Sequence, residues 1–311
     1  MSMTDHRETV ETFTSLIDAA RHDDARALLG DAVHAALARG ATRTATTLIG
    51  HAVGPLVTAG RWSEALEFLD EALASVEAEV DPISRGRLLA GRSGLLRTPR
   101  RYSEALDAQT EAISLLEGNV PESLLTTLRH DRAVLLADLG HADEAVSGFV
   151  AAREAFLGIR DRVGVAACDH NLGFVLHDLG ALDDAIEYLT EARDIFLAIG
   201  MGEEAASCDQ NLGVIFYDAN RLADAGRRFA VARHRFVEYE AMTSAAECDA
   251  NVSTLLTSMG RGDEAARYRQ RAEAAGVGIP TAPGTSSQFP AVASTGPPED
   301  QSRGALGSAS A

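Results

Sequence analysis

Alanine recurs at fixed positions of a forty-residue period along most of this chain. One column comprises Ala25, Ala65, Ala105, Ala145, Ala185, Ala225 and Ala265. A second column follows seven residues behind it, at Ala32, Ala72, Ala112, Ala152, Ala192, Ala232 and Ala272. Two columns that keep the same period indicate an array of one supersecondary unit rather than a single globular core.

Each period contains the pattern of two helices. In the unit 161–200 the apolar residues follow three- and four-residue steps, which are typical of a helix; they are Cys168, Leu172, Val175, Leu176 and Leu179. Gly180 ends this helix, and the same place holds Gly60, Gly140, Asn220 and Gly260. Acidic or hydroxyl residues, such as Asp183, then open a second helix, where they can bond free N–H groups. We therefore expect an all-α fold, a right-handed α-solenoid of about seven antiparallel helix pairs.

The array has three predicted regions. Residues 1–40 diverge most and form a capping helix pair, and residues 41–275 hold the forty-residue repeats. Residues 276–311 are rich in Pro, Gly, Ser and Ala without periodicity, and we expect a disordered tail there. Pro82 and Pro121 suit helix starts, whereas Pro55 falls inside a predicted helix and should kink or shorten it.

Charge and composition exclude several functions. The formal net charge is −18 at pH 7, which opposes binding to nucleic acid or to an anionic membrane. All 28 basic residues are arginine, so neither a Schiff-base lysine nor a P-loop lysine is present. Residues 1–10 have no apolar segment typical of a secretory signal, and no apolar run approaches the ~20 residues of a membrane span. We expect a cytoplasmic protein.

The three cysteines also recur one period apart, at Cys168, Cys208 and Cys248. Equivalent helices are two packing steps apart, each of roughly 8–10 Å, which is too far for a disulfide or a shared metal ion. We expect reduced, buried thiols. We expect neither a metal nor another cofactor.

The motif around the alanines resembles the tetratricopeptide repeat. Leu172-Gly173 precedes Ala185 and Ala192, and Leu212-Gly213 precedes Ala225 and Ala232 in the same way. The family's usual repeat has about 34 residues; this one is similar to the longer type found in kinesin light chains. The segments 192–200 and 208–213 look like bacterial repeats that adjoin regulatory ATPases and transcription activators. The resemblance covers residues 5–275, with two departures: the closing proline is absent, and aspartates replace the usual aromatic at Asp169, Asp209 and Asp249.

An asparagine column is the best candidate for ligand contact. The first helix of each pair lines the inner surface of such a superhelix, and it holds Asn171, Asn211 and Asn251, with Asp131 in the same column. Asparagine has both a donor and an acceptor, so it can bond the backbone of an extended peptide whatever the peptide's sequence. The resemblance to long-repeat relatives implies the same role. The alternative is that each asparagine bonds its neighbouring repeat.

Other polar and aromatic residues follow this face at helical spacing. They are His170, Phe174, His177 and Asp178 in one repeat, and Gln210, Tyr217 and Asp218 in the next. His170 and His177 are seven residues apart, about 10 Å along a helix, so they cannot share a metal ion unaided. We expect a polar, mildly acidic groove. The aspartate column should pair with Arg153, Arg193 and Arg233 in exposed inter-repeat ion pairs off this face, worth ~0–1 kcal/mol each.

These observations predict a non-enzymatic scaffold that binds a peptide or protein segment in its concave groove. The alternative is a regulatory peptide sensor, similar to bacterial quorum-sensing regulators of this repeat class but without a DNA-binding domain. An enzyme that uses the His and Asp face is a third hypothesis, and the sequence has no nucleophile elbow, phosphate loop, HExxH or CxxC to support it. Self-association through the end repeats is possible.

Overall fold

The computed structural model describes residues 3–19, 21–74, 76, 81–98 and 100–284. These residues form fourteen helices and no strand, which confirms the predicted all-α class. The helices are α1 Met3–Asp18, α2 His22–Ala38, α3 Thr42–Thr58, α4 Trp62–Ala74, α5 Pro82–Arg97, α6 Tyr102–Leu116, α7 Glu122–Asp138, α8 Ala142–Gly158, α9 Arg162–Asp178, α10 Leu182–Ala198, α11 Gly202–Asp218, α12 Leu222–Glu238, α13 Met242–Ser258 and α14 Gly262–Ala274. From α7 onward, three residues separate each helix from the next.

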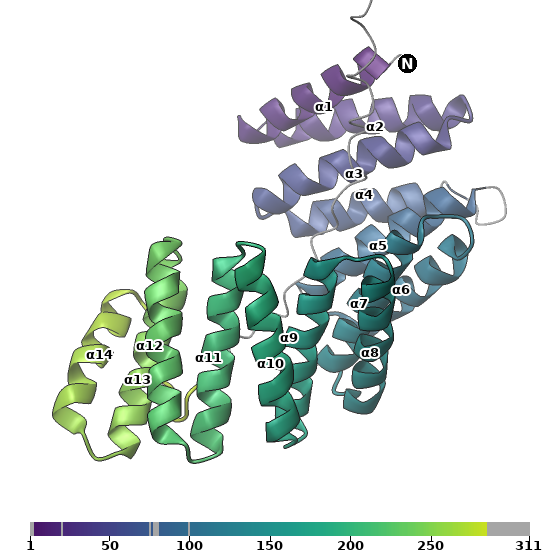
Figure 1. Cartoon of the computed structure of the whole chain (residues 1–311). Coiled ribbons are helices and arrows are strands. Elements are labelled where there is room, and N and C mark those ends of the chain that lie inside the picture. Colours follow the sequence, from purple (N-terminus) through teal and green to yellow (C-terminus); the bar gives the residue numbers. More distant parts are fainter. Residues whose placement is uncertain (1–2, 20, 75, 77–80, 99, 285–311) are drawn as a thin grey trace, which may run out of the picture.

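Each helix packs against the next one along the chain, so the helices form an α-solenoid (Figure 1). Contacts also join α1 to α3, α3 to α5, α7 to α9 and α9 to α11. The odd-numbered helices therefore form the inner layer and the even-numbered helices the outer one. In Figure 1 the row changes direction between α4 and α7, where the helices turn from lying across the view to standing upright.

The first alanine column lies in the contact between the two helices of a pair, whereas members of the second, such as Ala152 and Ala232, pack against the first helix of the next pair. Every alanine of the first column is at most 1% exposed, and in the second column only Ala32 is partly exposed. A methyl group on Gly173 would lie 2.5 Å from Cγ of Leu189 and 3.1 Å from the carbonyl oxygen of Ala185. The small residues are thus needed because the helix backbones approach closely.

A second repeating contact joins each pair to the next one. Phe156 packs with Cys168, Phe196 with Cys208, and a third phenylalanine, Phe236, with Cys248. The three thiols are free and buried, as predicted. Burial raises the pKa of the Cys208 thiol well above its ordinary value, so it stays protonated.

The helix ends follow the predicted pattern only in part. Gly180 has a φ of +79° and Asn220 one of +57°, the left-handed conformation expected after a helix. The acidic first turns do not cap the even-numbered helices: at α6, α8, α10, α12 and α14 the N-cap side chain makes no hydrogen bond. At α6 and α14 the acidic residue instead pairs with a basic residue three positions earlier, in Arg101–Glu104 at 2.6 Å and Arg261–Glu264 at 2.7 Å.

Two further expectations are corrected. Pro55 does not shorten α3, which continues through the proline to Thr58. The predicted disordered tail begins differently as well. Residues 277–284 have no regular secondary structure, bend at residues 281 and 282, and are hydrogen-bonded to α13, whereas residues 285–311 lie outside the described part of the chain. None of the described helices has both the length and the apolar character that a bilayer span requires.

Candidate peptide-binding groove

All the candidate residues lie on inner helices: one on α7, five on α9, four on α11 and one on α13. The three asparagines are deeply buried, with Asn171 at 0%, Asn211 at 1% and Asn251 at 3% exposure. Two neighbours, His170 and Gln210, are buried as well. The rest are more accessible: Asp131, Phe174, His177 and Tyr217 are half-buried, while Asp178 and Asp218 are exposed. The structure thus brings the candidates to one layer without showing a ligand contact for the column as a whole.

Two of the asparagines bond the preceding repeat. Nδ2 of Asn171 lies 3.0 Å from Nε2 of His130, and Nδ2 of Asn211 lies 3.0 Å from Nε2 of His170. Because the amide nitrogen donates, each imidazole accepts at Nε2 and has its proton on Nδ1. Nδ1 of His130 faces a carboxylate oxygen of Asp131 at 3.3 Å. Burial lowers the pKa of His170 to about 4, so that ring is neutral at physiological pH.

Both contacts span 41 residues, one repeat plus one residue, and two other pairs have the same spacing. Arg97 pairs with Asp138 at 3.3 Å, and His177 pairs with Asp218 at 2.7 Å. Side chains of successive inner helices therefore form a ladder of polar contacts. This ladder fixes the rotation of one repeat relative to the next.

Asn251 bonds a different kind of partner. Its Nδ2 donates to the carbonyl oxygen of Gly284 at 2.9 Å, and its Oδ1 accepts the amide N–H of the same residue at 2.9 Å. One turn further along α13, the hydroxyl of Thr254 donates to the carbonyl oxygen of Pro280 at 2.8 Å. Pro283 is buried beside this contact. An asparagine of the predicted column thus holds a backbone segment through both the donor and the acceptor of its side-chain amide.

The difference between the asparagines has a cause in the sequence. One period plus one residue before Asn251 stands Gln210 rather than histidine, and its Oε1 faces the thiol of Cys248 at 3.6 Å. Gln210 thus accepts a hydrogen bond from Cys248. The amide of Asn251 pairs with the segment 277–284 instead.

The buried polar atoms of α9 are not all satisfied. Oδ1 of Asn171 and Nδ1 of His170 are buried and have no hydrogen-bond partner among the described residues. A buried polar group without a partner costs ~1–3 kcal/mol. Oδ1 of Asn171 is an acceptor and Nδ1 of His170 is a donor, so the two atoms complement the N–H and the carbonyl group of a peptide. The equivalent oxygen of Asn251, Oδ1, accepts the N–H of Gly284.

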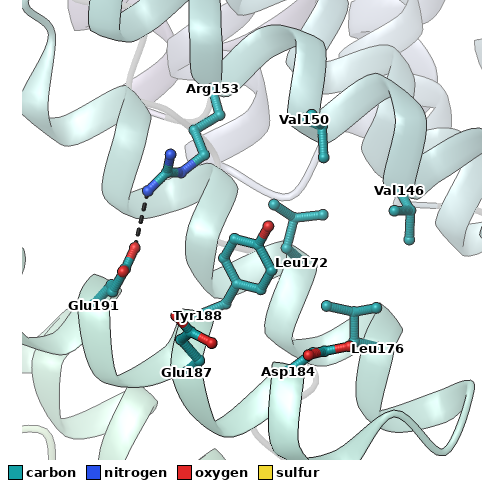
Figure 2. A pocket seen from close by; sticks show the side chains of 9 residues that line it. All are labelled: Val146, Val150, Arg153, Leu172, Leu176, Asp184, Glu187, Tyr188 and Glu191. Atoms are coloured by element: carbon teal, nitrogen blue, oxygen red, sulfur yellow. Dashed lines mark hydrogen bonds and ion pairs between the residues drawn. The ribbon is translucent and has the colours of Figure 1, made fainter.

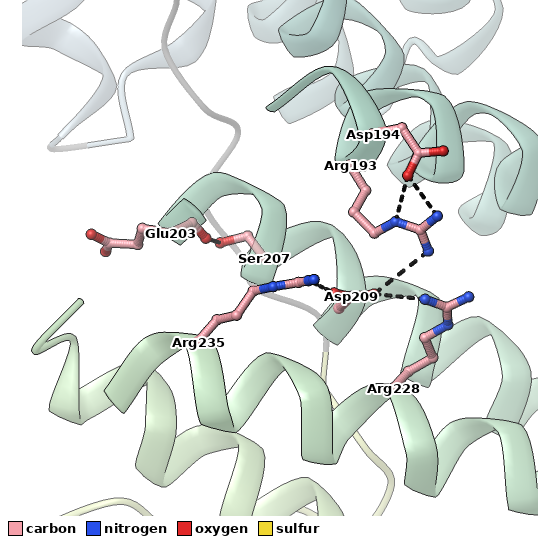
Figure 3. Close-up of polar contacts among 7 residues, drawn as sticks. All are labelled: Arg193, Asp194, Glu203, Ser207, Asp209, Arg228 and Arg235. Carbon is pink, nitrogen blue, oxygen red and sulfur yellow. Dashed lines mark hydrogen bonds and ion pairs between the residues drawn. The ribbon is translucent and has the colours of Figure 1, made fainter. Parts of the chain in front are cut away.

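The aspartate column forms the predicted pairs with arginine, but it is buried rather than exposed. The side chains of Asp169 and Asp209 are 0% exposed and that of Asp249 is 4%. Figure 3 shows three arginines, Arg193, Arg228 and Arg235, converging on Asp209. Burial raises the pKa of Asp169 to about 6, against the lowering effect of its ion pair with Arg153. These carboxylates therefore join repeats internally, and the predicted value of an exposed pair does not apply to them.

A cavity of about 430 Å³ lies elsewhere, between α8 and α10 over α9 (Figure 2). Its lining includes Tyr188, Arg153 and Glu191. Nη2 of Arg153 donates to Oε2 of Glu191 at 2.9 Å. None of the candidate residues lines it. Across the described part of the chain, no three His, Cys, Asp or Glu side chains are arranged to hold a metal ion.

The fold defines a class of protein, a tetratricopeptide-type α-solenoid. No protein-family model and no curated protein sequence matches the chain. Solved structures share its fold. BtubC (BKLC) from P. vanneervenii is 20% identical with a TM-score of 0.57, over 69% of this chain and 88% of that one. Aspartyl phosphate phosphatase F from Bacillus subtilis is 12% identical with a TM-score of 0.61, over 92% and 97%. A Rap protein complexed with Competence and Sporulation Factor is 15% identical with a TM-score of 0.61, over 86% and 75%.

Proposed function

We propose that this protein is a non-enzymatic scaffold that binds an extended peptide or protein segment along the inner helices α7, α9, α11 and α13. The asparagine column holds the ligand's backbone. The observation that carries this proposal is the pair of hydrogen bonds between Asn251 and the backbone of Gly284. Oδ1 of Asn171, in the same column, is a buried acceptor that a ligand N–H can fill.

Selectivity then comes from the accessible side chains beside the column. Phe174 and Tyr217 offer half-buried aromatic surface, and the His177–Asp218 pair offers charge at its edge. The net charge of −18 disfavours nucleic acids and anionic membranes as ligands. We place the activity in the cytoplasm, and self-association through the end repeats is compatible with it.

A regulatory peptide sensor is the second candidate. Two structural neighbours support it: a Rap protein is complexed with Competence and Sporulation Factor, and a Rap conjugation gene regulator of the plasmid pLS20 is complexed with the Phr* peptide. A free short peptide that binds and changes the pitch of the solenoid would favour this role. A stable heteromeric complex on purification would favour the scaffold.

Affinity capture tests the proposal. Wild-type protein and the triple variant Asn171→Ala, Asn211→Ala, Asn251→Ala are used side by side on native lysate, and the captured proteins are compared by mass spectrometry. The matched control is Ser93→Ala with Ser253→Ala, which removes buried hydroxyl groups that bond the carbonyl oxygens of Ala105 and Ala265 within their own repeats.

We expect the triple variant to lose its partners and the serine control to keep them. Capture that survives the triple change contradicts the groove. Because one structural neighbour is named a phosphatase, hydrolysis of an acyl phosphate is measured in parallel. Turnover above background would contradict the non-enzymatic assignment.

A further inference from the structure

We infer that the segment 277–284 is an internal ligand of the groove, which an incoming peptide displaces from α13. The inference rests on the proposed function, because it takes the asparagine column as the peptide site. It adds a regulatory element and a description of the ligand. The groove is self-occupied at one end, and the occupant is an irregular segment that contains proline.

The contacts to this segment are made with its backbone. Asn251 pairs with the N–H and carbonyl of Gly284, and Thr254 donates to the carbonyl of Pro280. These bonds do not depend on the side chains of the segment. A peptide whose backbone follows the same path can therefore replace it at α13.

The segment also indicates which peptides fit. Asn251 bonds the backbone of Gly284, where an added Cβ would meet no atom within 4 Å, and the preceding residue, Pro283, is buried. Proline restricts the unbound chain to extended conformations, so less conformational entropy is lost on docking. We therefore expect the partner to supply a compact apolar residue, such as proline, directly before the residue whose backbone Asn251 bonds, and to tolerate a side chain on that bonded residue.

The position of the segment makes it a competitor. Only residues 275 and 276 separate α14 from it, so it is tethered close to α13. A segment docked in about 90–99% of molecules lowers the apparent affinity for a competing peptide about 10- to 100-fold. Release of the segment would then open the site without any change in the repeats.

The test uses the full chain with Pro283→Asp and Gly284→Pro. The first change puts a charge at the buried position, and the second removes the N–H that Asn251 accepts, while Asn251 and Thr254 stay intact. The probe is a fluorescent synthetic peptide of residues 277–284, amidated at its C-terminus, and binding is followed by anisotropy. We expect it to bind the variant about 10- to 100-fold more tightly than the wild type. A probe with the same two changes should not bind, and adding Asn251→Ala to the variant should abolish binding.

Amide hydrogen exchange over 281–284 gives a second measurement. We expect slower exchange in the wild type than in Asn251→Ala, with unchanged circular dichroism. Equal probe binding to wild type and variant, no binding to either, or equal exchange would each overturn the inference. Protection that disappears on dilution together with an oligomer would also overturn it and assign the segment to a second copy. The proposed function has a separate outcome, since loss of partners in the triple asparagine variant does not depend on the tail.

Discussion

Nδ2 of Asn171 lies 3.0 Å from Nε2 of His130, while Oδ1 of the same side chain is buried without a partner in the described part of the chain. The two ends of this amide therefore have different roles. The nitrogen joins one repeat to the next, and under the proposed function the oxygen accepts an N–H of the ligand. The equivalent amide of Asn251 uses both ends on the backbone of Gly284.

Acid should destabilise the protein through His170. Its pKa is about 4 in the fold because burial disfavours the charged ring, against an ordinary value of 6.5. The stabilisation is complete above pH 6.5 and is lost as the pH falls towards 4, since the unfolded chain binds the proton first. We expect a loss of about 2 kcal/mol between pH 7 and 5.

The measurement is urea unfolding of wild type and His170→Gln at both pH values. Glutamine occupies the equivalent place at Gln210 and can accept the bond from Asn211. The comparison is needed because Asp169, with its pKa raised to about 6, acts in the opposite sense and stabilises the fold as the pH falls. An identical pH dependence in both proteins would contradict the assignment of a neutral, buried His170.

Loss of the buried ion pair between Arg153 and Asp169 should destabilise the protein more than loss of the exposed ion pair between Arg153 and Glu191. Arg153→Met leaves the fully buried carboxylate of Asp169 without its principal partner, and we expect a loss of about 3 kcal/mol in the free energy of unfolding. Glu191→Gln removes the exposed ion pair with Arg153, and we expect it to lower the free energy of unfolding by less than about 1 kcal/mol. The double variant Arg153→Met, Asp169→Asn should recover much of the loss, and a simple sum of the single effects would argue against coupling.

Two helical glycines should respond to alanine in opposite directions. Gly173→Ala forces a methyl group against Leu189, so we expect a loss of about 1–3 kcal/mol. Gly94 is exposed in α5 with nothing near its added Cβ, and Gly94→Ala should gain about 0.5–1 kcal/mol through helix propensity. Thermal unfolding of both variants checks this, and equal shifts would contradict the close packing at Gly173.

The thiols should be unreactive in the native state. Cys168, Cys208 and Cys248 are each 0% exposed, and burial raises their pKa values. We expect a thiol reagent to label none of them in the native protein and all three in denaturant. Rapid labelling under native conditions would mean that the packing between repeats opens readily.

The period and the packing within a repeat could be predicted because they depend on sterics that are local in sequence. Ala185 and Gly173 are small where two neighbouring helices touch, and Gly180 ends a helix with a φ that few other residues adopt. Such constraints recur in every repeat. Their spacing therefore shows in the sequence as columns.

The polar contacts were harder to predict because they depend on how far each helix is rotated. The burial of Asp209 requires arginines from α10 and α12 to converge on it (Figure 3), which periodicity alone does not indicate. A signal for the His–Asn ladder was present, since His130–Asn171 and His170–Asn211 share a spacing of 41 residues. Docking of 277–284 had no such signal, because a Pro- and Gly-rich composition predicts disorder whether or not a groove receives the segment.

The most direct test of backbone recognition uses two substitutions at Asn171. Asn171→Asp keeps an acceptor oxygen but loses the donor to His130, whereas Asn171→Ala loses both. The affinity of the captured partner's peptide for each full-length variant is measured by anisotropy, with melting temperatures recorded alongside. If Oδ1 receives a ligand N–H, Asn171→Asp retains most of the binding and Asn171→Ala loses about tenfold or more. Equal losses in both variants would contradict the account, because they would assign Asn171 only to the contact between repeats.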